Sequence, residues 1–330
     1  MSKVQRIGLF VVGNYSCQEV LRYAKVAEEN GYDSIWLAED LGFRDATVPL
    51  ASLAVSTKRI KLATGILAVY YRSPALTAMT AATLDELSGG RLVLGLGSGA
   101  PRFLAAQGID SSKPLGALRE YIEIIRQILK GDSVTYKGRF HNLTDVKLSF
   151  KPPRLRIPIY VAARRKKMLQ LAGEIADGVF VDDGFCSESY IRWARENVRQ
   201  GLEKTGRNPR DVDFSCAVIL SVSPDHDQAK ENVKPSVLSV LSEGYLNPFL
   251  EMWGLTVADI TPARDAWFRG DISEACKKTP DALLDGSAIY GTPDECRKKM
   301  AEFRAAGVEM PVIKPIGPNT ETTIELASNW

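Results

Sequence analysis

Glycine and serine gather at residues 97–99, directly after an apolar run. Residues 92–96 read Leu-Val-Leu-Gly-Leu, a composition typical of a buried strand, and Gly97, Ser98 and Gly99 follow at once. Glycine has no Cβ, so a flat ring or a phosphate can come close to its backbone. The spacing from Gly95 resembles part of a dinucleotide fingerprint, but the last glycine is missing and Pro101 follows. We therefore interpret residues 97–99 as a ligand-approach site at a strand end.

Two adjacent carboxylates, Glu39 and Asp40, follow the apolar run at residues 34–37. A carboxylate in this position can hydrogen-bond a cofactor ring or a substrate and can relay a proton. The alternative is a solvated loop or an N-cap for the next helix. We predict that Glu39 and Asp40 are the catalytic residues.

A second glycine site lies at Thr64, Gly65 and Ile66, where glycine interrupts an apolar strand. Glycine inside a strand usually marks a bulge or a close approach of another group. A packing glycine beneath the next helix is the alternative. We predict that these three residues contact a cofactor.

A cluster of cations follows another expected strand. Ala162 and Ala163 lead into Arg164 and Arg165, and two lysines come next. Backbone N–H groups and the positive end of the dipole at a helix start favour anions. Residues 162–165 are therefore predicted to hold a phosphate or another anionic part of a cofactor, the alternative being a solvated helix start.

The expected strand ends lack the residues of metal and nucleophile chemistry. The chain has two histidines, His141 and His226, which fall outside these ends, and its five cysteines form no C-x-x-C pair. A zinc hydrolase and a histidine-based triad are thereby disfavoured, and we predict no metal site. Strand ends of this kind suit a reaction carried by a bound cofactor.

The elements that position these residues alternate between strand and helix. Expected strands span residues 6–12, 34–37, 60–67, 91–96, 157–162, 178–181, 214–222 and 311–315, and helical patterns follow them. Eight such units predict the α/β class and a (β/α)8 TIM barrel, which places ligands at the carboxyl ends of its strands. Two insertions are expected, a β-hairpin near residues 134–150 and a helical segment near 225–284. No linker divides the chain, so residues 1–330 are predicted to form a single domain.

Composition limits the partners. Lys and Arg number 42 against 40 Asp and Glu, so no strong field favours nucleic acid or an anionic membrane. No signal peptide and no apolar run long enough for a membrane span are visible. Scattered cysteines indicate a reducing compartment, and we expect a cytoplasmic protein.

Taken in order, several segments resemble the bacterial-luciferase-like superfamily, and within it the coenzyme F420-dependent oxidoreductases, especially the methylenetetrahydromethanopterin reductases. The resemblance runs nearly end to end. It is carried by AEENGYDSIWLAED (27–40), TLDELSGGRLVLGLGSGAP (83–101), LGALREYIEIIRQILKGD (115–132), VTYKGRFH (134–141), FKPPRLRIPIYVAA (150–163), LAGEIADGVFV (171–181) and YGTPDECRKKMAEFRAAGV (290–308).

The resemblance implies roles for the same residues. It implies a non-prolyl cis peptide between Gly65 and Ile66 behind the deazaflavin ring, and it places residues 97–99 beside the ring and ribityl chain. Residues 162–164 would hold the phosphate, and Glu39 with Asp40 would occupy an acidic position near the ring.

The function that the resemblance implies is hydride transfer between C5 of the deazaflavin of coenzyme F420 and an electrophilic carbon, for example that of methylenetetrahydromethanopterin. An FMN-dependent monooxygenase of the same fold and a non-catalytic ligand-binding barrel are the alternatives. The expected partners are a small-molecule substrate and further copies of the chain.

Overall fold

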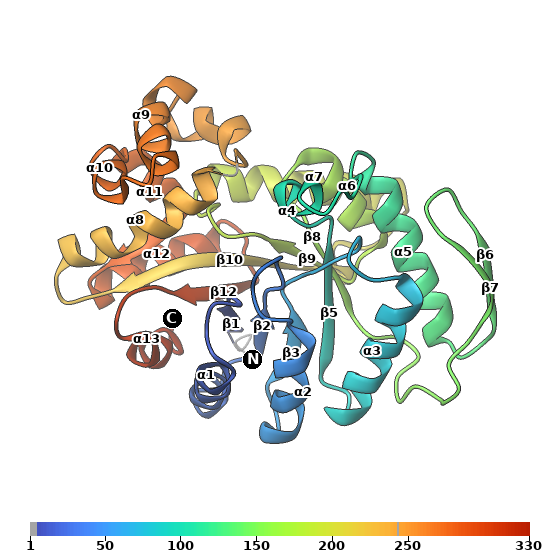
Figure 1. Cartoon of the computed structure of the whole chain (residues 1–330). Helices are drawn as coiled ribbons and strands as arrows, with labels where there is room; N and C mark the ends of the chain where they lie inside the picture. Colours follow the sequence, from blue (N-terminus) through green and yellow to red (C-terminus); the bar gives the residue numbers. More distant parts are fainter. Residues whose placement is uncertain (1–4, 243) are drawn as a thin grey trace. The chain divides into compact units, whose positions relative to one another are not determined.

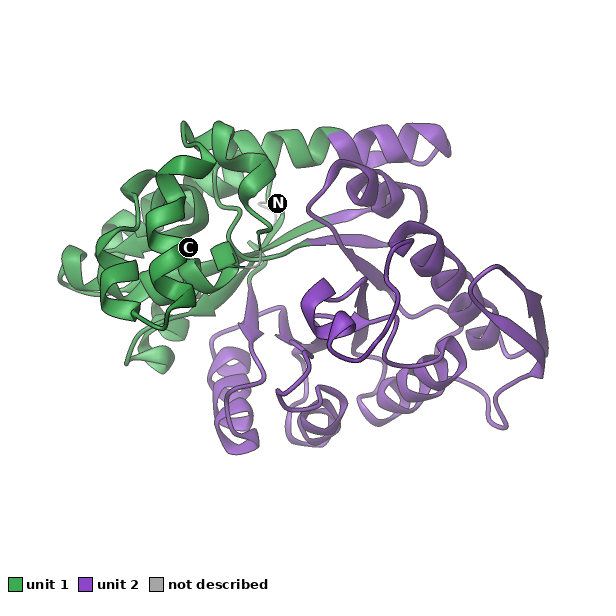
Figure 2. Cartoon of the chain, turned by 45° about the horizontal axis from the view of Figure 1, so that its top comes forward, with its two compact units in different colours: residues 1–7, 181–196, 214–330 green, residues 8–180, 197–213 purple. Residues whose placement is uncertain are grey.

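The structure is a computed structural model that describes residues 5–242 and 244–330. Its residues group into two compact units, which Figure 2 shows in different colours. Of the described residues, unit 1 contains 5–7, Val181–Glu196, 214–242 and 244–330, and unit 2 contains Gly8–Phe180 and Asn197–Asp213.

Unit 2 is built on a parallel sheet whose strands are paired in the order β1, β2, β3, β5, β8 and β9. Their bounds are Gly8–Val11, Ser34–Leu37, Lys61–Thr64, Leu92–Gly97, Ile159–Ala162 and Gly178–Val181, the last residue of β9 belonging to unit 1. The register sets Leu37 beside Thr64 and Leu96 beside Val161. The strands run in one direction, so the residues that follow them lie along one edge of the sheet.

Helices connect these strands, as the labels in Figure 1 show. They are α1 (Cys17–Glu29), α2 (Thr47–Ser56), α3 (Pro74–Leu87), α4 (Pro101–Ala105), α5 (Pro114–Leu129) and α6 (Lys166–Ile175), with a short 3-10 turn at Pro209–Asp211. Local signals explain where they begin. Ser16 and Glu19 form a capping box at α1, and Ser73 caps α3, whose first residue is Pro74.

Large aromatic side chains fill the core of unit 2 between its strands. The rings of Trp36 and Phe180 stack with their centroids 4.8 Å apart, and Tyr160 meets Trp36 edge-on at 5.3 Å. Phe10 lies 5.7 Å from Phe180. All four are buried, and the contiguous apolar area stabilises the sheet from within.

Unit 1 contains three parallel strands, paired in the order β11, β10 and β12. Their bounds are Ala288–Gly291, Asp213–Val222 and Met310–Pro315, the first residue of β10 belonging to unit 2. Between β10 and β11 the chain is helical, with α8 (His226–Ser242), the 3-10 segment Asn247–Trp253, α9 (Val257–Phe268), α10 (Ile272–Lys277) and α11 (Asp281–Ser287). The helices α12 (Pro293–Ala305) and α13 (Thr320–Ala327) follow β11 and β12. Helix α7 (Glu188–Lys204) begins in unit 1 and ends in unit 2.

Along the chain, the eight expected parallel strands are each followed by a helix, which is the element order of a (β/α)8 barrel, and β11 is an additional parallel strand. Both predicted insertions are present. The hairpin consists of β6 (Val134–Lys137) and β7 (Asn142–Val146), and the helical insertion spans α8 to α11.

Three elements differ from the prediction. The strand expected at residues 60–67 is divided into β3 and the short β4 (Leu67–Ala68), because the chain bends at the cis peptide bond between Gly65 and Ile66. Strand β11 and helix α4 were not expected. Each has only four or five residues, too few for a hydrophobic period to emerge.

No helix in the described part of the chain is long and apolar enough to cross a membrane.

Candidate cofactor site

The carboxyl-end edge of unit 2 contains a cradle formed by Gly97, Ile66 and Ala162. A Cβ built on Gly97 would lie 3.0 Å from Cδ1 of Ile66 and 3.1 Å from Cβ of Ala162. The structure therefore brings together one residue from each of three predicted segments. A side chain on Gly97 would crowd the other two residues, so their close packing requires glycine there.

Gly99 completes this loop in the left-handed region, with φ of +70°. A Cβ there would lie 2.8 Å from Cβ of Ala68, so both the conformation and the space require glycine. Ser98, between the two glycines, is half-buried.

Thr64 and Gly65 contact different parts of unit 2. The Thr64 hydroxyl donates to the Gly95 carbonyl at 2.7 Å and accepts from the Gly95 amide at 2.8 Å, so this buried side chain joins β3 to β5. Gly65 and Ile66 are joined by a cis peptide bond, as the resemblance implies. A Cβ on Gly65 would lie 3.0 Å from Cε2 of Phe10 and 3.1 Å from Cβ of Trp36. Gly65 thus rests on the aromatic core.

Glu39 forms an ion pair that the sequence did not predict. Its Oε1 accepts from Nη2 of Arg72 at 2.9 Å, and the same Nη2 donates to Oδ2 of Asp45 at 2.5 Å. Burial alone would lower the pKa of Arg72, but the hydrogen bonds and charges of the two carboxylates raise it above its usual value. The guanidinium therefore stays charged between them.

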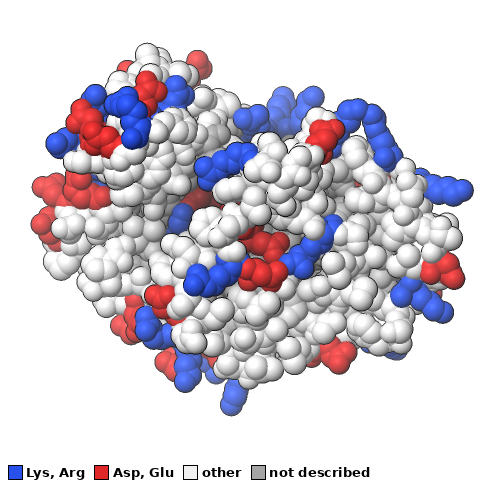
Figure 3. All heavy atoms as spheres, in the orientation of Figure 1, with Lys and Arg blue, Asp and Glu red and all other residues white. Residues whose placement is uncertain are grey.

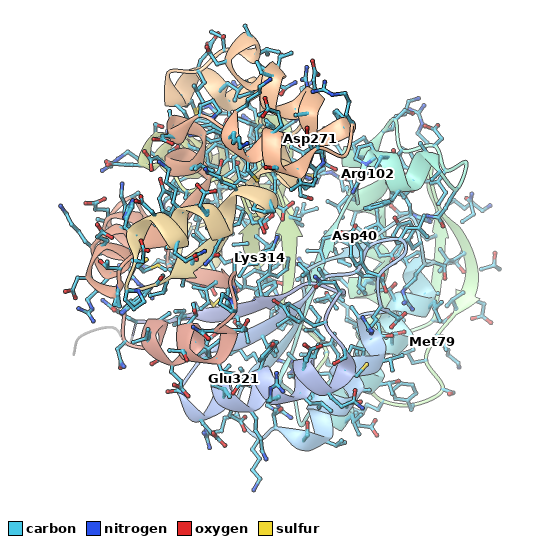
Figure 4. The ribbon with its side chains drawn as sticks, turned by 60° about the vertical axis from the view of Figure 1, so that its left-hand side comes forward. Asp40, Met79, Arg102, Asp271, Lys314 and Glu321 are labelled. Atoms are coloured by element: carbon cyan, nitrogen blue, oxygen red, sulfur yellow. The ribbon has the colours of Figure 1, made fainter. Side chains whose placement is uncertain are left out.

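Asp40 lies beside Glu39 in the loop after β2, and Figure 4 labels it there together with Arg102 at the start of α4. Burial, followed by the charges of Asp40 and Glu39, raises the pKa of Tyr71. This phenol therefore remains protonated near two carboxylates. The structure places Glu39, Asp40, Tyr71 and Arg72 close to one another in unit 2.

The cationic segment opens helix α6. Arg165 is the N-cap of that helix, in an extended conformation, and makes no side-chain capping bond. Its carbonyl accepts from the amides of Met168 and Leu169, so the first amides of the helix are left for another acceptor. Ala163 is buried, and its amide donates to the Phe180 carbonyl at 3.0 Å. Arg165 is exposed and Arg164 half-buried at this end of the helix.

Polar groups also follow the strands of unit 1. Nζ of Lys314, near the end of β12, lies 2.6 Å from Oδ2 of Asp183, which follows β9. Figure 4 labels Lys314. Near the end of β10, Nδ2 of Asn232 donates to the Ser221 hydroxyl at 3.3 Å.

Arg72 and Asp45 are the site residues that sequence reasoning missed. Arg72 precedes the N-cap serine of α3, and Asp45 precedes α2. A charged residue beside a helix start is common on protein surfaces, so neither position carries a specific signal. Only the fold shows that the two loops meet at Glu39.

Fold and site together define a (β/α)8 protein whose candidate ligand-binding residues lie at the carboxyl ends of the strands. More specifically, the chain belongs to the family described as luciferase-like monooxygenase, whose model matches residues 6–310.

Several individual proteins are similar to this chain over nearly its whole length. The chain is 36% identical to the 5,10-methylenetetrahydromethanopterin reductase of Archaeoglobus fulgidus, over 97% of each chain. It is 31% identical to a putative coenzyme F420-dependent oxidoreductase of Mycobacterium tuberculosis, over 95% of this chain and 96% of that one. The solved structure of the coenzyme F420-dependent tetrahydromethanopterin reductase from Methanopyrus kandleri superimposes with a TM-score of 0.91 at 29% identity. That match covers 98% of this chain and 97% of the other, and it confirms the barrel fold.

The residues of unit 2 fit a flat-ring cofactor with an anionic tail. The cradle at Gly97 has no room for a Cβ, so only the glycine backbone is presented there, beside Ile66 and Ala162. Oε2 of Glu39 is buried and has no hydrogen-bond partner among the described residues, so it offers an acceptor to a ligand. The start of α6 offers amides and cations to an anion.

Proposed function

We propose that this protein is an oxidoreductase that uses coenzyme F420 to transfer a hydride to or from an electrophilic carbon of a small-molecule substrate. The observation that carries the proposal is the end-to-end similarity to methylenetetrahydromethanopterin reductases, with 36% and 34% identity to two of them. When bound, the deazaflavin supplies or accepts the hydride at its C5.

The residues of unit 2 have separate tasks in this proposal. Gly97, with Ile66 and Ala162, accommodates the ring. Phe10 and Trp36 provide a buried apolar floor under Gly65, which keeps water from that side. Glu39 is positioned to accept a hydrogen bond, and Asp40 adds a second negative charge near the ring edge.

Arg164, Arg165 and the amides at the start of α6 are proposed to hold the phosphate of the cofactor. A charge-assisted hydrogen bond is about twice as strong as a neutral one, and the helix dipole adds to it. Ser98 and Gly99 complete the loop beside the ring and ribityl chain, and the backbone at Thr64 and Ala163 closes the same edge.

The substrate proposed first is methylenetetrahydromethanopterin, because three of the relatives act on it by name. The test is anaerobic turnover of reduced F420 with this substrate, followed by the return of the absorbance of oxidised F420. Enzyme-dependent oxidation is the expected result. Absence of turnover in an enzyme that binds F420 would withdraw this substrate and keep the cofactor. Binding of FMN with oxygen consumption would instead favour the monooxygenase alternative.

We further propose that the protein forms a homodimer through helices α2 and α3, which pack side by side in unit 2. Their outer faces carry the exposed apolar side chains Val48, Val55, Leu76, Met79 and Leu87. Helix α2 has no charged residue, and on α3 Asp85 is buried against Arg154 whereas Glu86 is exposed. In Figure 3 the surface over these helices is mostly white.

A second copy of the chain is the occupant that this surface fits. Around a twofold axis the same patch meets itself, and two patches that each carry the single exposed charge of Glu86 do so with little like-charge repulsion. The small side chains between the apolar ones also let two helix pairs approach closely.

We also propose that the chain works as a single domain in the cytoplasm. The family match over residues 6–310 runs through both compact units. All five cysteines are free, and Cys216 and Cys296 are buried thiols, as is usual in a reducing compartment.

A further inference from the structure

The two carboxylate oxygens of Glu39 have different surroundings. Oε1 accepts the hydrogen bond from Arg72, whereas Oε2 is buried without a partner among the described residues. The side chain as a whole is only 10% exposed. An ionised oxygen removed from water and left without a donor is costly, so native structures rarely leave one unfilled. The position of Oε2 therefore indicates a missing donor.

Arg72 is itself fixed from several sides. Asp45, its second acid partner, accepts at Oδ1 from the amide of Thr47 at 2.7 Å, the hydroxyl of Thr47 at 2.6 Å and the amide of Val48 at 3.1 Å. Burial opposes the charge of Asp45, but these bonds and the one from Arg72 lower its pKa. Asp45 is thereby anchored to the first turn of α2 and holds the guanidinium in place.

The backbone of Arg72 is held as well. Its carbonyl accepts from the hydroxyl of Tyr121 at 3.1 Å, and that hydroxyl lies 2.5 Å from Oγ1 of Thr77. Burial raises the pKa of Tyr121 to about 12, so this donor stays protonated. The next residue, Ser73, caps α3. Arg72 thus connects the starts of two helices to one oxygen of Glu39.

We propose that Arg72 is a positioning residue that fixes Glu39 so that Oε2 accepts a hydrogen bond from a neutral donor of the ligand, such as the lactam N–H of a fused ring. A carboxylate is an acceptor only, which selects a donor. The surroundings of Oε2 disfavour an anionic ligand group, because Asp40 is adjacent and the charge of Arg72 is already shared by Glu39 and Asp45. The inference rests on the proposed function only for the choice of probe, oxidised F420.

The experiment measures F420 affinity by fluorescence titration in four proteins: the wild type, Arg72→Gln, Arg72→Lys and the control Arg119→Gln. Arg119 pairs with Glu174 in the same unit, away from the candidate site, so the control removes one arginine charge without touching Glu39. Arg72→Gln should raise the Kd at least about tenfold. Arg72→Lys should stay within about threefold, because one Nη2 makes both contacts and an ammonium can replace it. The control should match the wild type.

Two further measurements separate positioning from general damage. Guanidinium ion added to Arg72→Ala should recover part of the lost affinity, which it would not do for a loosened fold. Glu39→Gln should lose about as much affinity as Arg72→Gln, and the double variant should lose little more, because both act through one oxygen.

The outcomes are distinct. Wild-type protein that does not bind F420 contradicts the proposed function. Wild-type binding with an unchanged Kd in folded Arg72→Gln, or fully additive losses in the double variant, overturns the positioning role. Should Arg72→Gln fail to fold, Asp45→Asn replaces it. That variant should raise the Kd about threefold, and an unchanged Kd overturns the role equally.

Discussion

At the scale of single residues, two glycines on one strand have different tasks. Gly95 and Gly97 lie on the same face of β5, two residues apart. A Cβ on Gly95 would lie 2.0 Å from the Thr64 carbonyl oxygen, whereas the atoms nearest to a Cβ on Gly97 would be side-chain atoms of Ile66 and Ala162, at 3.0 Å and more. The first glycine serves the fold, and the second is proposed to serve the ligand.

Gly95→Ala and Gly97→Ala test this division. Gly95→Ala should lower the free energy of unfolding by about 3 kcal/mol or more, because the backbone of β3 must move. Gly97→Ala should cost about 1 kcal/mol yet raise the Kd for F420 about tenfold. Denaturant unfolding measures the free energy of unfolding of both variants, and fluorescence titration measures their Kd for F420. Equal effects of the two substitutions on binding would refute the separate roles.

Arg164→Ala combined with Arg165→Ala should weaken F420 binding by about 1–3 kcal/mol at low salt. The loss should shrink as salt is added, because mobile ions screen the interaction that the wild type retains. Titrations at several salt concentrations measure how the Kd for F420 changes with salt in the wild type and in the double variant. Parallel slopes with equal affinities would assign the two arginines to a solvated helix start.

The resemblance and the residue types singled out glycines that the structure places at strand ends, but not the partners of Glu39. The cradle joins segments from residues 66, 97 and 162, each of which carried a glycine or strand-end signal of its own. Arg72 and Asp45 lie in loops whose meeting depends on the register of β2 and β3 and on the packing of α2 against α3. Sequence spacing contains no information on such a meeting.

At the scale of elements, hydrophobic periodicity predicted the long helices and the buried strands well. Strand β9 has the expected bounds, because an apolar run defines it, and helix α3 begins at Pro74, a residue typical of a helix start. The short β11 and α4 were missed, since four or five residues do not complete a pattern.

Helix α12 allows a test of pH dependence. Oε2 of Glu295 accepts from His226, from the Thr292 amide and from the Thr292 hydroxyl, and these bonds lower the pKa of Glu295 to about 2. A carboxyl with a lowered folded-state pKa contributes stability above its unfolded pKa and loses it as the pH falls toward the folded value.

Glu295→Gln should therefore lower the Tm at neutral pH. The difference from the wild type should be constant down to about pH 5 and shrink between about pH 4 and pH 2, where the wild-type carboxylate becomes protonated. Thermal unfolding across this range measures it, with exposed Glu302→Gln on the same helix as control. A Tm difference that stays constant to pH 2 would contradict the assigned bonds.

At the scale of the whole molecule, the exposed apolar side chains on α2 and α3 predict a dimer. Val55→Lys combined with Met79→Lys should convert it to a monomer, because each introduced ammonium would be buried opposite its symmetry mate. Sedimentation or light scattering gives the mass directly. A wild-type protein that is monomeric at tens of micromolar would contradict the proposed dimer. A double variant that remains dimeric would show that the interface lies elsewhere.

The central claim is that residues at the carboxyl ends of the strands of unit 2 bind a deazaflavin, which carries the hydride to or from the substrate. Its most direct test is a side-by-side titration of the purified protein with oxidised F420 and with FMN, followed by fluorescence at matched concentrations. We predict saturable, stoichiometric binding of F420 at low micromolar concentration or below, weakened by Gly97→Ala, with FMN binding at least about tenfold more weakly. Tighter binding of FMN, or no binding of F420 by the folded protein, would contradict the account.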